Sequence, residues 1–403
     1  MAGVRWGAEL SRRRAAAAMA AVLAAATTAT LAGCGGSGSR ERSIAVQRML
    51  DKRGAALVQR DEDAFLATAA PADRQAQRRV FGNLADVPLA AFTYRLKSRL
   101  PDTTPARATL EVGYRLRGHD TAAVTITERV RLSERDGRWY VAGAAGAPEQ
   151  LWDQGRVRVV RGEHSIVLGV GHDAARLRSI AYTADRAVPA ASRAWSGSWA
   201  RRVVVLAPAS LDAMARMLGA PPDEYRGMAA VTTGEAGGGH RAPADRVVVN
   251  PEAYDLLGKV GRRIVLTHEI THVATRSATS SATPLWLSEG FADWAGYRAA
   301  GRSPRQGAPE LARAVAAGRV PSALPRDKDF RFGSDPEALA RAYEEAWLAC
   351  VLIADRWGQE KLEAVYRGVG KGGGVSAVLQ KELGVDLAEF TASWRSFLVA
   401  QLG

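Results

Sequence analysis

A short stretch with two histidines four positions apart constrains this chain most. Residues 267–272 read Thr-His-Glu-Ile-Thr-His. Neither proline nor glycine occurs between Arg262 and Arg276. The apolar residues around the pair predict a buried helix: Ile264, Val265, Leu266, Ile270 and Val273. Helical residues four apart lie about 40° apart around the axis and about 6 Å along it. His268 and His272 would therefore face one zinc ion together, with chance spacing as the alternative.

A third ligand is expected from a second helix. Glu289 follows His272 after sixteen intervening residues, and Pro284 predicts the start of a helix after a polar turn. An antiparallel pair of helices would bring Glu289 back over the two imidazoles, and a hydrolytic zinc site takes three protein ligands. The alternative for Glu289 is an exposed helical carboxylate. Asp293, one turn further on the same face, is expected to accept the second ring N–H of a zinc-bound histidine.

These two segments resemble a known enzyme branch. Residues 268–272 (His-Glu-Ile-Thr-His) and 286–292 (Trp-Leu-Ser-Glu-Gly-Phe-Ala) are similar to the gluzincin zinc metallopeptidases, in the peptidase-MA-like families distantly similar to the aminopeptidase N group. The resemblance covers roughly residues 155–403. It implies Zn2+ held by two histidines and a glutamate, and hydrolysis of peptide bonds by a zinc-activated water with Glu269 as general base.

The chain also departs from the aminopeptidases. Its gap of sixteen residues is shorter, and no close match to their Gly-Ala-Met-Glu-Asn strand occurs. Residues 229–234 would be the corresponding edge strand and would bind peptide by strand addition, but they lack the glutamate that holds a free amino terminus. Endopeptidase and exopeptidase action both stay open. Tyr343 lies where the relatives carry a tyrosine that stabilises the oxyanion, with a core aromatic as the alternative.

The N-terminus predicts export. Three arginines at 12–14 precede an uncharged, alanine-rich stretch that ends in small residues before Cys34, as in a secretory signal. Residues 31–34, Leu-Ala-Gly-Cys, resemble a bacterial lipobox, which implies removal of residues 1–33 and a lipid on Cys34. Residues 34–40 would then be the lipidated cysteine and a flexible tether. The protein is expected on the outer face of the cell membrane, with an uncleaved membrane anchor as the alternative.

The fold expected from these patterns is α+β with two domains. Residues 41–70 have helical periodicity, and residues 110–116 and 124–132 alternate as strands before a turn at Asp136-Gly137. This order of elements resembles the NTF2-like domain, with a helix and a curved antiparallel sheet, over residues 41–150. Residues 155–403 are expected to form the gluzincin-like domain, mostly helical with a small sheet.

Composition limits the partners. The formal net charge is +13, and removing residues 1–33 takes away four arginines and one glutamate to leave +10. Such a surface suits anionic lipid. No basic stripe with interleaved aromatics occurs, so nucleic acid is not expected as a partner. The resemblance to zinc metallopeptidases implies a peptide or protein substrate. The two cysteines give no disulfide framework if Cys34 carries lipid, and Cys350 is expected to be buried on a helix.

Two other functions stay open at the level of the sequence. One is a non-catalytic zinc-containing surface lipoprotein that binds a partner or ligand through the N-terminal domain. Glu269 argues against it, because a purely structural zinc site has no use for that carboxylate. The other is a peptidase kept latent by the N-terminal domain.

Overall fold

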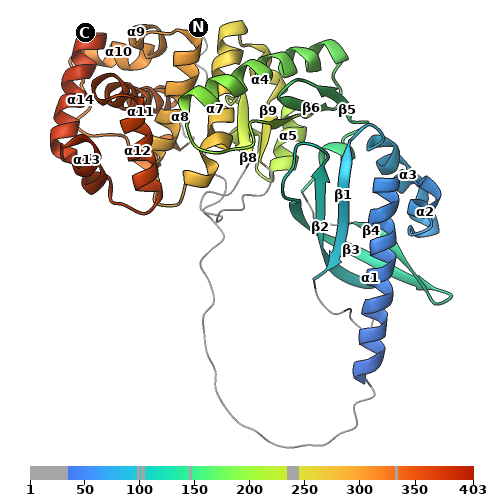
Figure 1. The fold of residues 1–403 in the computed structure, drawn as a ribbon. Coiled ribbons are helices and arrows are strands. Elements are labelled where there is room, and N and C mark those ends of the chain that lie inside the picture. Colours follow the sequence, from blue (N-terminus) through green and yellow to red (C-terminus); the bar gives the residue numbers. More distant parts are fainter. Residues whose placement is uncertain (1–34, 98–99, 101–104, 145–147, 234–244, 332–334) are drawn as a thin grey trace, which may run out of the picture. The chain divides into compact units, whose positions relative to one another are not determined.

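The computed structural model describes residues 35–97, 100, 105–144, 148–233, 245–331 and 335–403. The chain forms two compact units, of which the first ends at Val157 and the second runs from Arg158 to Gly403 (Figure 1). Cys34 and the predicted signal segment 1–33 lie outside the described residues. Within the described part of the chain, no helix combines the length and the apolar character needed to cross a membrane.

The first unit consists of helices followed by a curled antiparallel sheet. Its helices are α1 (Gly35–Gln59), α2 (Glu62–Leu66) and α3 (Arg74–Asn83), with 3-10 turns at Pro71–Asp73 and Leu151–Asp153. Its strands pair in chain order: β1 (Leu89–Leu96), β2 (Ala106–Leu116), β3 (Val124–Arg135) and β4 (Arg138–Ala144). Asp136 and Gly137 close the β3–β4 hairpin with φ of 52° and 69°, the positive values that a type I′ turn requires.

Helix α1 packs against β1 through a glycine. A Cβ on Gly54 would lie 2.3 Å from the carbonyl oxygen of Phe92, so only glycine lets the helix approach the strand this closely. The guanidinium of Arg53 is buried beside this contact, 3.9 Å from the centroid of the Phe65 ring. Apolar side chains from both layers fill the remaining core, among them Leu50, Leu57, Leu110 and Leu132.

The second unit begins with a five-stranded mixed sheet. Its strands are β5 (Arg158–Arg161), β6 (Ser165–Gly169), β7 (Val203–Ala207), β8 (Ala230–Thr233) and β9 (Arg246–Val249), in the spatial order β5-β6-β7-β9-β8. β6, β7 and β9 are parallel, and β5 and β8 pair antiparallel to their neighbours. β8 is therefore an edge strand of this sheet.

Helices make up the rest of the second unit. In chain order they are α4 (Ala174–Ala194), α5 (Leu211–Leu218), α6 (Pro251–Asp255), α7 (Lys259–Thr275), α8 (Leu285–Ala300), α9 (Pro304–Gly307), α10 (Pro309–Ala316), α11 (Pro336–Trp357), α12 (Gln359–Gly370), α13 (Val375–Leu383) and α14 (Leu387–Leu402). Short 3-10 helices lie at Pro222–Glu224, Arg276–Ala278 and Asp327–Phe330. α7 packs between α4, α8 and β8, and α8 packs between α7 and α11.

Two glycines let α8 approach both of its helical neighbours. A Cβ on Gly290 would lie 2.3 Å from the carbonyl oxygen of Ala346 on α11. On the side of α7, a Cβ on Gly296 would lie 2.9 Å from the carbonyl oxygen of Ile264. Larger side chains at these two positions would push the helices apart. The glycines therefore bring α7 and α8, which carry the candidate ligands, to a short separation.

The α+β class expected from the sequence agrees with the described residues, but several element boundaries do not. The helix predicted over 41–70 is divided, because Arg60 has φ of 63° and Asp61 then caps α2. Residues 34–40 were expected to be the lipidated cysteine and a flexible tether, whereas α1 already begins at Gly35 and continues without a break to Gln59. A proline inside a helical pattern predicts a kink or an interruption at Pro189, whereas α4 continues through it.

Candidate metal centre

Helix α7 carries three of the candidate residues into the interior. The second half of α7 contains no proline or glycine. Four apolar residues of this helix are buried as predicted: Ile264, Val265, Leu266 and Ile270. His268 and Glu269 are buried with them. The side chain of His272 is 16% exposed, so the cluster meets solvent on the side of His272.

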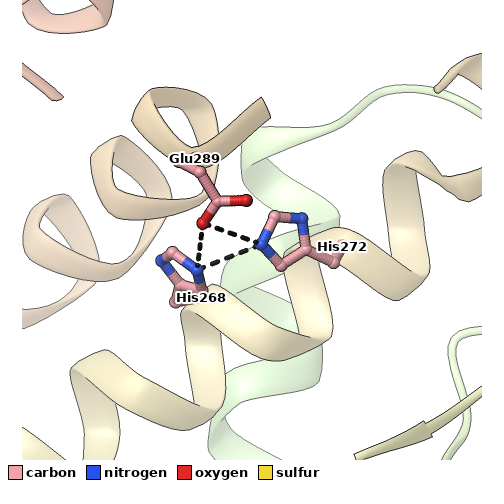
Figure 2. Close-up of side chains that lie close together, drawn as sticks. All are labelled: His268, His272 and Glu289. Atoms are coloured by element: carbon pink, nitrogen blue, oxygen red, sulfur yellow. Dashed lines mark hydrogen bonds and ion pairs between the residues drawn. The ribbon is translucent and has the colours of Figure 1, made fainter. Parts of the chain in front are cut away.

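The structure brings the two histidines and Glu289 together (Figure 2). Nε2 of His268 lies 3.0 Å from Nε2 of His272, and Oε2 of Glu289 lies 3.3 Å from the first nitrogen and 3.6 Å from the second. Three donors at about 2.0–2.1 Å from a tetrahedral zinc ion are roughly 3.3 Å apart. The three measured separations bracket this value, so the donor set fits one zinc ion.

Asp293 orients the first histidine. Its Oδ1 accepts a hydrogen bond of 2.8 Å from Nδ1 of His268, and both side chains are buried. When the ring is neutral, as metal ligation requires, the N–H on Nδ1 leaves the lone pair on Nε2, which faces the other two ligand atoms. Burial lowers the pKa of His268, but Asp293, Glu289 and Glu269 outweigh it and raise the pKa well above its ordinary value. These carboxylates give the cluster an excess of negative charge that a cation would offset.

Glu289 is the part of the cluster that most needs a cation. Its Oε2 is buried and accepts no hydrogen bond of good geometry from the described residues, although two imidazole nitrogens lie nearby. Burial raises the pKa of Glu289, but His272 and His268 lower it to about 2, so the carboxylate stays ionised. A buried, ionised oxygen without a donor is costly, and a bound metal ion would supply the missing partner.

Glu269 presents its two carboxylate oxygens to different surroundings. Oε2 accepts a hydrogen bond of 2.6 Å from the hydroxyl of Thr232 on β8. Oε1 is buried and has no hydrogen-bond partner among the described residues. Burial is the main cause that raises the pKa of Glu269, which suits a group that must accept a proton and later release it.

Tyr343 lies on α11, the helix packed against α8. Its ring meets the ring of Phe330 edge-on at a centroid distance of 5.1 Å. Burial raises the pKa of Tyr343 well above its ordinary value, and the charges of Glu289, Asp293 and Glu269 raise it further. The phenol therefore keeps its proton and lies within electrostatic reach of the cluster.

Thr232 is the site residue that the sequence did not single out. The residue spacing of the motif on α7 does not indicate Thr232, because its contact with Glu269 joins residues 37 positions apart in the chain. A strand was expected at residues 229–234, and β8 confirms it at Ala230–Thr233. The prediction that Cys350 is buried on a helix is also confirmed, since this residue is buried on α11.

Together the fold and these contacts define a buried cluster of two histidines and a glutamate, with the carboxylates of Glu269 and Asp293 beside it. Neither a family model nor a curated protein matches the chain. Among solved structures, native yeast LTA4 hydrolase matches with 16% identity and a TM-score of 0.34, over 68% of this chain and 44% of that one. Its complex with bestatin matches with 17% identity and a TM-score of 0.34, over 61% and 38%.

A third solved structure is a mutant of a two-domain M1 zinc metallopeptidase bound to L-tryptophan. It matches with 15% identity and a TM-score of 0.30, over 66% of this chain and 58% of that one. This chain thus spans less than two thirds of the length of each of the three structures. TM-scores this low do not establish a common fold.

Proposed function

We propose that this chain is a zinc-dependent metallopeptidase of the gluzincin type that hydrolyses peptide bonds. One observation carries the proposal. His268, His272 and Glu289 converge within 3.6 Å of one another, while the neighbouring Glu269 keeps one buried oxygen without a partner among the described residues. Three ligands leave one zinc position for a reactant, which is the arrangement of catalytic zinc sites.

His268 and His272 would hold zinc through Nε2, and Glu289 through a carboxylate oxygen. When bound, zinc polarises a carbonyl oxygen and makes a water molecule more acidic. Asp293 keeps the ring of His268 in the tautomer that ligation requires, because its Oδ1 accepts the N–H at Nδ1. Glu289 adds the negative charge that distinguishes this set from a neutral histidine site.

Glu269 would move the protons. Its Oε1 takes a proton from the attacking water as the oxygen forms a bond to the carbonyl carbon. The electron pair of the carbonyl bond moves onto its oxygen, where the Tyr343 phenol would donate a hydrogen bond. When the C–N bond breaks, Glu269 passes the same proton to the leaving nitrogen, so the carboxylate is regenerated. The raised pKa of Tyr343 keeps its O–H available as a donor.

The proposal extends to the place where the enzyme works. Residues 1–33 would be cleaved off and Cys34 would carry a lipid, which would anchor the protein to the outer face of a bacterial cell membrane. The substrate is then a peptide or protein outside that membrane. The first unit, with three helices before a four-stranded antiparallel sheet, supports an NTF2-like assignment for residues 41–150.

Zinc content and peptide hydrolysis of the wild type and of Glu269→Gln test the proposal. We expect about one zinc per chain in both proteins, hydrolysis of casein or a broad peptide library by the wild type, and a loss of roughly 100-fold or more in the variant. Zinc in both proteins without turnover by either would favour a non-catalytic surface lipoprotein. Deleting residues 41–150 in a separate variant distinguishes a latent peptidase, whose activity would rise.

A further inference from the structure

The edge strand β8 contacts the proposed base through a side chain. Oγ1 of Thr232 lies 2.6 Å from Oε2 of Glu269 and 3.0 Å from the backbone carbonyl oxygen of the same residue. One hydroxyl thus contacts both the main chain and the tip of a single glutamate. Since these two contacts fix the distance and direction between backbone and carboxylate, they restrict the side-chain torsions of Glu269.

This restriction matters because a glutamate does not orient its own carboxylate. The terminal torsion of glutamate is broad and roughly two-fold, so the two oxygens exchange places unless a neighbour distinguishes them. Thr232 distinguishes them here, since it donates to Oε2 and leaves Oε1 buried without a hydrogen-bond partner among the described residues. A proton acceptor must lie within hydrogen-bond reach of the proton it takes, and small misplacements are costly.

We propose that Thr232 is a positioning residue, which holds Glu269 so that Oε1 is the oxygen that accepts the proton of the attacking water. The inference deepens the proposed function and rests on it. Thr232 acts through Glu269, which its hydroxyl contacts, and is not itself one of the three proposed ligands. Its removal should therefore change the turnover number, kcat, and leave zinc binding in place.

The strand itself supplies a matched control. Thr233 is the next residue along β8, and successive strand residues point to opposite faces. Its Oγ1 accepts a hydrogen bond of 3.1 Å from the backbone N–H of Arg246. Thr232→Val and Thr233→Val remove one hydroxyl each from the same edge strand and keep the β-branched shape that strands favour. Only the first change removes the donor to Glu269.

The kinetic experiment compares the wild type, both valine variants and Thr232→Ser in their zinc-loaded forms. We expect kcat of Thr232→Val to fall by roughly 10- to 100-fold with little change in KM. Thr232→Ser, which keeps a hydroxyl, should recover most of kcat, and Thr233→Val should resemble the wild type. Zinc affinity, measured by competition with a chelator, should fall by less than roughly 10-fold. A larger fall is expected only when a hydrogen bond that orients a zinc ligand is lost. Equal kcat for Thr232→Val and the wild type, or a parallel loss of zinc affinity, would overturn the inference.

Crystal structures of zinc-loaded wild type and Thr232→Val provide a readout that does not depend on turnover. The expected result is one orientation of the Glu269 carboxylate in the wild type and a rotated or divided one in the variant. An unchanged Glu269 in the variant would refute the positioning role. A wild type that binds zinc and hydrolyses no peptide refutes the proposed function instead, while the crystallographic comparison still decides whether Thr232 positions Glu269.

Discussion

Asp293 and His268 form a buried pair that connects α8 to α7, with 2.8 Å between Oδ1 and Nδ1. The same helix α8 also carries Glu289, one turn before Asp293. One helix therefore supplies a proposed ligand and the acceptor that orients a ligand on the neighbouring helix. This arrangement makes zinc affinity depend on a residue that does not itself face the ion.

Replacing Asp293 should weaken zinc binding. In Asp293→Ala the ring of His268 loses its acceptor, and we expect zinc affinity to fall by roughly 10- to 100-fold. Asp293→Asn keeps an oxygen that accepts the N–H but loses the charge, so its affinity should lie between those of the wild type and the alanine variant. Competition with a chelator measures all three. Equal affinities for the wild type and Asp293→Ala would contradict the orienting role.

Zinc should stabilise the folded protein, because it binds the assembled cluster and not the unfolded chain. At a free zinc concentration 100 times Kd, the expected gain in the free energy of unfolding is about 2.7 kcal/mol. Thermal unfolding with and without added zinc measures it, with magnesium at the same concentration as the control. His272→Ala lacks one proposed ligand and should lose most of the shift in Tm. The same shift in that variant would place the stabilising ion elsewhere.

Gly290→Ala should destabilise the second unit. The new methyl group would lie 2.3 Å from the main-chain oxygen of Ala346, which cannot move as a flexible side chain does. Overpacking of this kind costs about 1–3 kcal/mol. Gly261→Ala on α7 is the matched control, because its Cβ would meet only the side chain of Leu257, at 3.4 Å. Denaturant unfolding should separate the two variants, and equal midpoints would argue against the close helix contact.

Glu344 should make stability depend on pH. Burial raises its pKa to about 8, even though the backbone N–H groups of Glu310 and Leu311 donate to its carboxylate and lower it in part. At a pH between 4.5, the ordinary pKa of a glutamate, and about 8, Glu344 keeps its proton in the folded protein and has released it in the unfolded chain. The contribution of Glu344 to the free energy of unfolding is therefore largest below pH 4.5 and is lost as the pH rises toward 8, by up to about 1.4 kcal/mol per unit.

The comparison of wild type with Glu344→Gln isolates this contribution. The glutamine variant has no proton to release, so the wild-type free energy of unfolding minus that of the variant should decrease between pH 5 and pH 8. Glu337→Gln changes an exposed residue on the same helix and serves as the control. A difference that stays constant or rises with pH would contradict the raised pKa of Glu344.

Local patterns in the sequence predicted much of the fold and of the candidate site. Asn followed by Pro is a typical start of a helix, and at α6 the Asn250 side chain accepts from the N–H groups of Glu252 and Ala253. Helical spacing likewise indicated that His268 and His272 share a face. Such signals work because the interacting groups are at most one helical turn apart.

Other elements carried no such signal. Helix α3 has no buried residue, so the apolar periodicity that predicts a helix is missing there. Strand β1 begins with a bulge between Leu89 and Ala91, which breaks the period-two alternation of its side chains. The contact of Thr232 with Glu269 depends on how a strand edge packs on a helix, and residue spacing does not encode that packing.

The close main-chain contacts at Gly290 and Gly296 have a consequence for assembly. Because close contacts with two neighbouring backbones hold α8 in place, we expect the ligand-bearing helices to acquire their separation during folding, before an ion binds. Chelation should then empty the centre reversibly, with little change in circular dichroism. A chain that folds ahead of its ion can take up zinc after folding is complete.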